Sequence, residues 1–174
     1  CGHESAMLVP TQTVFLRDAA DQAACEELFA AYELLAATVT HFVVEPPCSG
    51  ARLAVEAWAI GGLGLTVERR SAQSVTVTYD GIQWLYTGVV KPLSATAGVH
   101  GQALDVFQQT HGLLGVVGLG WQNVVRTWWQ LEGLTAVQGH TQRYLELNRA
   151  RAEAFAGINF GNGRLSAVAH HLGY

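Results

Sequence analysis

The chain has 174 residues, of which 49% are apolar and 14% are charged, and its formal net charge is -4. This length suits one domain or two small units, and the scarcity of charge predicts a protein that buries much of its surface, in part against other copies. The acidic balance provides no basic field for phosphates, which argues against a nucleic-acid partner and leaves small molecules open.

Three cysteines, Cys1, Cys25 and Cys48, are scattered and form no CxxC pair, so they predict no disulfide framework and favour a reducing cytoplasm. No apolar run approaches the roughly 18 residues of a membrane span, so we expect no membrane partner. Residues 1–5 lack the basic and apolar regions of a signal peptide, and an opening Cys in place of Met suggests processing.

The first third of the chain predicts a strand, a helix and two further strands. Residues 11–16 are rich in β-formers, and residues 19–37 repeat apolar side chains at helical spacing. Residues 38–45 are dense in β-branched and aromatic side chains and end at Pro46, which cannot donate to a ladder. Residues 52–60 alternate as a second such strand.

A glycine-rich stretch followed by a polar one marks a boundary between two units. Gly61, Gly62 and Gly64 are succeeded by the charged run 68–70, and we expect residues 61–70 to be a linker. Residues 1–60 then form a first unit and residues 71–174 a second.

The second unit predicts a hairpin, a helix, a strand and a helix. Residues 74–79 and 83–90 flank Asp80-Gly81, a dipeptide typical of tight hairpins. Helical spacing covers residues 101–119 and 141–155, and the tryptophan-rich run 123–131 predicts a strand between them. Hairpins and short strands separated by helices indicate an α+β sheet with helices packed on one face. The tail after residue 157 shows no convincing further strand.

These elements resemble parts of two consecutive RidA-like (YjgF-like) units. A strand ending in VFLRD, a helix, a strand, and a last strand of the form LxVEAxA at residues 53–59 are similar to the back half of such a domain. The hairpin, long helix, strand and following helix of residues 71–174 are similar to its front half. The resemblance implies the RidA-like, or chorismate-mutase-like, mixed sheet with helices on one face. That fold commonly forms trimers with clefts at the interfaces, which implies a homotrimer or an assembly with another chain.

A more specific pattern points to the chorismatase branch of this superfamily. The segment VVRTWWQL at residues 124–131, followed by QRYLELNRAR at residues 142–151, is similar to the chorismatase pattern of RxWxxL followed by RYxxxNxxR. Residues 2–5 and the Cys48-containing approach to residue 57 are weaker similarities. The resemblance implies an enzyme of aromatic secondary metabolism that releases pyruvate from the enolpyruvyl ether of chorismate or a related intermediate. A carboxylate would act as acid, and polar groups would hold the substrate carboxylates.

Two departures from the superfamily pattern leave alternatives open. RidA proteins that hydrolyse imines place an arginine on the strand before the last, whereas residues 38–42 contain none. Each half is also incomplete, so the chain is a fragment, receives strands from another chain, or combines its halves as a permuted unit. The rival functions are another RidA-like enzyme acting on an imine, enamine or other intermediate, and a non-catalytic protein that binds a metabolite or partner.

Glu56 and Arg126 are the leading site candidates. An acid on the inner side of an apolar strand has its pKa raised by desolvation, which suits Glu56 to protonate an enol ether. Arg126, beside two tryptophans, has the planar fork that grips a carboxylate or stacks on an indole. The alternatives are a solvent-facing carboxylate at Glu56, and at Arg126 a structural ion pair with Glu132 or Glu146.

Four further residues complete the predicted site. Cys48 follows two prolines and suits either a pocket rim or a small buried position. Arg52 shares a strand face with Glu56, being four residues away, and Tyr86 and Trp128 offer a hydroxyl group and an indole to a substrate. The alternatives are a solvated charge at Arg52, a core position at Tyr86 and a subunit interface at Trp128. The histidines lack HExxH spacing and the glycines lack GxGxxG spacing, so we expect neither a metal nor a nucleotide cofactor.

Overall fold

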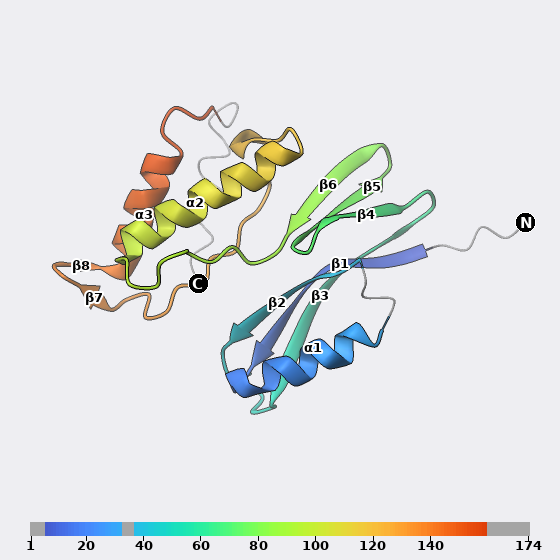
Figure 1. The fold of residues 1–174 in the computed structure, drawn as a ribbon, viewed down its shortest axis with the longest axis horizontal. Helices are drawn as coiled ribbons and strands as arrows, with labels where there is room; N and C mark the ends of the chain where they lie inside the picture. Colours follow the sequence, from blue (N-terminus) through green and yellow to red (C-terminus); the bar gives the residue numbers. More distant parts are fainter. Residues whose placement is uncertain (1–5, 33–36, 160–174) are drawn as a thin grey trace, which may run out of the picture. The chain divides into compact units, whose positions relative to one another are not determined.

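A computed structural model describes residues 6–32 and 37–159 of the chain (Figure 1). The chain divides into two compact units, Cys1–Val89 and Val90–Tyr174. The predicted linker at residues 61–70 therefore lies inside the first unit. The class is α+β, as the sequence predicts, with mixed and antiparallel sheets and three α-helices among the described residues.

The first unit begins with a three-stranded mixed sheet in the order β2-β1-β3. Its strands are β1 (Ala6–Leu16), β2 (Val39–Val44) and β3 (Leu53–Gly62). The central strand β1 runs parallel to β2 and antiparallel to β3. A 3-10 turn, η1 (Ala19–Asp21), and the helix α1 (Gln22–Ala30) make the crossover that a parallel pair requires. All three predicted strands are confirmed.

Helix α1 covers one face of this sheet through a small apolar core. Val14, Leu16 and Cys25 are buried there, with Phe29 and Phe42 packed against them. The two phenyl rings stack with centroids 6.4 Å apart. The 3-10 turn η1, which leads into the helix, starts where Asp18 Oδ1 accepts a hydrogen bond from the backbone of Ala20. The helix was predicted over residues 19–37 but ends at Ala30; residues 33–36 lie outside the described residues.

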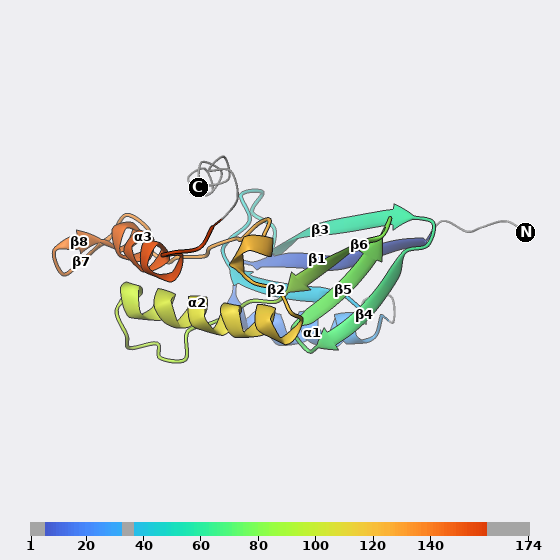
Figure 2. The same cartoon turned by 90° about the horizontal axis from the view of Figure 1, so that it is seen from above.

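A second, antiparallel sheet follows, made of β4 (Thr66–Ser71), β5 (Ser74–Tyr79) and β6 (Ile82–Thr87). Figures 1 and 2 show it over the face of the first sheet that α1 leaves free. Arg69 Nη2 donates to the carbonyl of Thr38, 3.0 Å away, and so ties the two sheets together. The predicted hairpin is confirmed, with φ of 49° at Asp80 and 73° at Gly81.

The stretch read as a linker is instead the connection between the two sheets. Gly64 adopts a φ of 71°, which glycine tolerates readily, and allows the tight turn that joins β3 to β4. The charged residues 68–70 lie in β4. There Arg70 pairs with Glu68 and also donates to the hydroxyl of Thr76.

The second unit contains α2 (Val99–Val116), the 3-10 turn η3 (Trp121–Asn123), the short strands β7 (Val137–Gln138) and β8 (Thr141–Gln142), and α3 (Arg143–Ala154). Both predicted helices are confirmed, with slightly different ends. Phe107 of α2 is buried at the centre of an aromatic cluster. Its ring centroid lies 5.7 Å from that of Trp121, 4.7 Å from Trp129 and 5.2 Å from Phe155.

The strand predicted at residues 123–131 is wrong. The segment follows η3 as irregular chain, and no described strand pairs with it. A strand of β-forming residues needs a partner ladder, and here the ring of Trp129 packs on Phe107 of α2 instead. Nothing is described of residues 160–174, on which the prediction about the C-terminal tail falls.

Within the described part of the chain, no helix combines the length and the apolar character needed to cross a bilayer.

Candidate functional site

A row of polar side chains crosses the face of the first sheet opposite α1. Thr13 of β1 is paired with His41 of β2 on one side and with Glu56 of β3 on the other. Directly paired residues point to the same face of a sheet, so the three side chains share it. The neighbouring row holds Thr11 and, opposite it on β3, Trp58. Thr11 Oγ1 lies 2.9 Å from His41 Nε2, within hydrogen-bonding distance.

Burial decreases along this row from β2 to β3. His41 is half-buried, and desolvation lowers the pKa of its imidazole, which favours the neutral ring. Glu56 is exposed, and Trp58 keeps 44% of its surface exposed. Both β2 and β3 are edges of the three-stranded sheet, and Arg69 of the second sheet contacts the chain at Thr38, next to β2. The predicted inner position of Glu56 is therefore wrong, and the side chain faces solvent, as in the alternative interpretation.

Arg52 does not join Glu56, contrary to the prediction from strand spacing. It precedes β3 by one residue and turns towards Asp21 of η1. Arg52 Nε donates to Asp21 Oδ2 over 3.2 Å, and Nη2 makes a closer contact with Oδ1. The hydrogen bond and the charge of Asp21 raise the pKa of the guanidinium. The Arg52 guanidinium is therefore paired with Asp21, the residue that precedes α1.

Cys48 and Tyr86 occupy other places in the first unit. Cys48 is exposed in the turn between β2 and β3, so it is not the small buried residue of the alternative reading; Cys25 has that position. Tyr86 lies on β6 opposite Val75 and is half-buried, and desolvation raises the pKa of its hydroxyl group. The predicted residues of the first unit therefore come from different elements.

Arg126 and Trp128 lie together in the second unit. The guanidinium carbon of Arg126 is 5.3 Å from the centroid of the Trp128 ring, within the range of a cation–π interaction. Trp128 keeps 60% of its surface exposed and Arg126 is also exposed. The predicted stacking of guanidinium on indole is observed. Glu146, one of the alternative partners of Arg126, is bonded to Arg149 and Thr141.

The second motif, RYxxxNxxR, places its residues on one face of α3. Tyr144, Asn148 and Arg151 are separated by four and three positions, so they follow one another along a single stripe. All three are half-buried. Asn148 Oδ1 is fully buried, and no hydrogen-bond partner for it lies among the described residues. A buried amide oxygen without a donor is destabilising, so such a group calls for a functional explanation.

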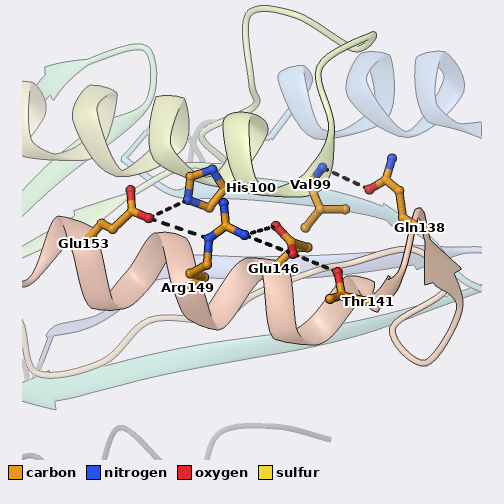
Figure 3. Close-up of polar contacts among 7 residues, drawn as sticks. All are labelled: Val99, His100, Gln138, Thr141, Glu146, Arg149 and Glu153. Carbon is orange, nitrogen blue, oxygen red and sulfur yellow. Dashed lines mark hydrogen bonds and ion pairs between the residues drawn. The ribbon is translucent and has the colours of Figure 1, made fainter.

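A different stripe of α3 is satisfied by polar contacts, drawn in Figure 3. Glu153 Oε1 lies 2.9 Å from His100 Nε2 of α2 and 3.7 Å from Arg149 Nε. Arg149 also pairs with Glu146 over 3.3 Å, and Thr141 donates to Glu146 over 2.7 Å. These contacts fasten α3 to the first turn of α2 and to β8, which indicates a structural role.

No protein-family model, no curated protein and no solved structure matches the chain. Residues 6–32 and 37–159 contain no group of three His, Cys, Asp or Glu side chains placed to hold a metal ion.

Two residues that the structure adds to the candidate sites, His41 and Asn148, were not predicted as site residues from the sequence. His41 was considered only as a metal ligand, and its place beside Thr13 depends on a pairing between strands about thirty residues apart. Asn148 belongs to the RYxxxNxxR motif, but its lack of a partner among the described residues depends on side-chain positions. The four-and-three spacing of Tyr144, Asn148 and Arg151 was the available signal.

Proposed function

We propose that the chain is a chorismatase-like enzyme of the RidA-like superfamily, which releases pyruvate from the enolpyruvyl ether of chorismate or a related intermediate. The observation that carries the proposal is the unsatisfied Asn148 amide oxygen within the RYxxxNxxR motif. The motif provides the resemblance, and within it the structure has a buried polar group for which residues 6–32 and 37–159 provide no hydrogen-bond partner.

The chemistry of the α3 stripe fits this substrate class. Chorismate carries two carboxylates and a hydroxyl group, so it needs cationic or amide donors and one acceptor. Arg151 and the amide nitrogen of Asn148 are donors, and Asn148 Oδ1 is an acceptor that a substrate hydroxyl would satisfy. A bond to a buried group of this kind gives strong discrimination, because an analogue without the hydroxyl leaves the acceptor unpaired.

Arg126 is the proposed carboxylate anchor. Arg126 is exposed, and its guanidinium lies over the Trp128 ring. An arginine held by an aromatic ring is pre-organised for a bidentate contact with a carboxylate. The first unit is less suited to bind a substrate with two carboxylates, because Glu56 is itself a carboxylate and Arg52 is paired with Asp21.

Incubation of the purified chain with chorismate, with pyruvate followed by a coupled dehydrogenase, tests the proposal. We expect pyruvate release, a higher KM for Arg126→Lys because lysine lacks the planar fork, and a loss of about 10- to 100-fold in kcat/KM for Asn148→Leu. Asn123→Leu is the matched control, since Asn123 Oδ1 already accepts a hydrogen bond from Gly120.

Absence of pyruvate from a folded protein contradicts the proposal. Turnover of an imine or enamine would then favour the rival enzyme. Binding of chorismate without turnover, lost in Asn148→Leu, would favour a metabolite-binding protein. Native mass measurement determines whether the active form is a homotrimer or an assembly with another chain, as the resemblance implies.

A further inference from the structure

The outer edge of strand β3 has backbone hydrogen-bonding groups that point away from its own sheet. The strand order β2-β1-β3 makes β3 an edge strand, and Figure 2 shows it at the outer side of the first sheet. We propose that this edge pairs with the same edge of a second copy of the chain, so that two β3 strands join antiparallel about a twofold axis. The inference does not depend on the proposed enzyme activity, which concerns residues of the second unit.

The hydrogen bonds to β1 identify which backbone groups of β3 face outwards. Just before β3, the N–H of Arg17 donates to the carbonyl of Arg52 over 2.9 Å, and the register continues from this pair into the two strands. In an antiparallel pair, alternate residues bond to the partner strand and the residues between them direct their N–H and C=O groups away from it. Ala54 and Glu56 therefore bond to β1, and the odd-numbered residues of β3 face outwards.

The outward groups belong to Leu53, Val55 and Ala57. All three residues are exposed, Leu53 by 41% and Val55 by 48%. Their outward N–H and C=O groups have no hydrogen-bond partner among residues 6–32 and 37–159. Their side chains form one row on the α1 side of the sheet, because Val55 is paired with Val14 of the apolar core. An exposed strand edge of this kind is a template for a further strand.

This edge lacks the features by which proteins usually prevent strand addition. Exposed edges are commonly interrupted by proline, lysine or a β-bulge. Residues 53–58 contain neither proline nor lysine, and Glu56 is their one charged residue. They also pair with β1 without a shift in register, since the irregularity of this pair lies beyond Thr11. The edge is therefore straight enough and apolar enough to pair.

The occupant that fits this edge is a second β3, because the strand is complementary to itself. With the twofold axis at Val55, all outward residues bond to one another, since Leu53 of one copy lies opposite Ala57 of the other. Glu56 then lies opposite Ala54. An axis one residue further on, at Glu56, would put two glutamates directly opposite each other, which is destabilising. The twofold also keeps both α1 helices on one side, so the exposed apolar rows of the two copies become neighbours.

The size of the contact predicts weak association. A stable interface buries about 800 Å² on each partner, and one strand edge with its apolar row is narrower than such an interface. We therefore expect the paired form to dissociate on dilution.

Sedimentation velocity of the purified full chain across a dilution series tests the proposal, and the mass of the assembly should double as the concentration rises. Val55→Pro removes an outward N–H but no bond to β1, and proline is tolerated where the N–H of an edge strand faces solvent. It should weaken association about tenfold or more, because both copies lose a hydrogen bond. Val55→Lys keeps the backbone N–H and adds a charge, and should also weaken association. Leu93→Lys is the matched control, at a position of the second unit that is 85% exposed, and should have no effect.

Amide hydrogen exchange, followed by NMR, shows whether this edge is the contact. The N–H of Val55 should exchange more slowly as the protein concentration rises, whereas the N–H of Ala54, which is bonded to β1, should be protected equally at every concentration. Exchange at Val55 that does not depend on concentration overturns the proposal, and so does a mass that still doubles in both Val55 variants, because the copies then associate through another surface. Either result leaves the Asn148 experiment on pyruvate release unaffected.

Discussion

His41 Nε2 and Thr11 Oγ1 are 2.9 Å apart on the face of the first sheet that lies opposite α1. The bond joins the central strand β1 to β2, and it holds the imidazole in a half-buried place where desolvation lowers its pKa. A ring that resists protonation in the folded chain makes stability depend on pH.

The sign of this dependence follows from linkage. In the unfolded chain the imidazole titrates near its ordinary value of 6.5, so below that pH the unfolded state binds more protons than the folded state. The free energy of unfolding should therefore fall as the pH drops below about 6.5, and level off below the lowered pKa. Urea titrations across this range should show a flatter profile for His41→Gln. The exposed His140 provides the control, since His140→Gln should retain the slope.

Asn148→Leu should stabilise the fold. The substitution removes a buried acceptor that has no donor among the described residues, and an apolar side chain of similar size suits the site. We therefore expect the free energy of unfolding to rise by about 1 kcal/mol. Asn123→Leu should lower it by a similar amount, because the bond from Gly120 is lost. Urea denaturation measures both. A destabilised Asn148→Leu protein would mean that the amide already has a partner.

Phe107→Ala should unfold much of the second unit. The ring is the shared neighbour of Trp121, Trp129 and Phe155, and removing a buried phenyl group costs about 3–5 kcal/mol. Tryptophan fluorescence during thermal unfolding reports the loss. Val116→Ala, at an exposed position of the same helix, should change stability by no more than about 0.5 kcal/mol. Similar effects of the two changes would show that the aromatic cluster does not stabilise this unit.

Gly81→Val should weaken the β5–β6 hairpin. Gly81 has a φ of 73°, which a β-branched residue adopts at a cost of about 1–3 kcal/mol. Asp80→Asn preserves the turn, because asparagine tolerates the positive φ of 49° at that position. Circular dichroism during urea unfolding should separate the two variants, and equal stability would exclude the tight turn.

The sequence predicted elements whose signals are local. The Asp80-Gly81 turn specifies its hairpin through two backbone conformations, and the helix α3 has an apolar repeat that includes Leu147 and Ala150, both buried. Residues 123–131 have equally strong β propensity, but a strand also needs a neighbour. That partner is decided by the whole fold, and Trp129 instead completes the cluster around Phe107.

The candidate site was less predictable because exposure depends on neighbouring strands. Periodicity correctly placed Glu56 within a strand, but could not show that β3 is an edge. Spacing placed Arg52 on the same face as Glu56, whereas Asp21, a residue far back in the chain, draws the guanidinium away. Gly64 predicted a boundary between two units, but the turn that it forms connects β3 to the charged strand β4.

The central position of β1 has a consequence for how the first unit is made. Both of its neighbours, β2 and β3, are joined to it across long stretches of sequence, so neither edge of β1 is covered by a local hairpin. Such distant pairings close slowly, and a truncated product that stops before Leu53 would expose one whole side of the strand. Premature termination there should yield aggregates and not a smaller folded protein.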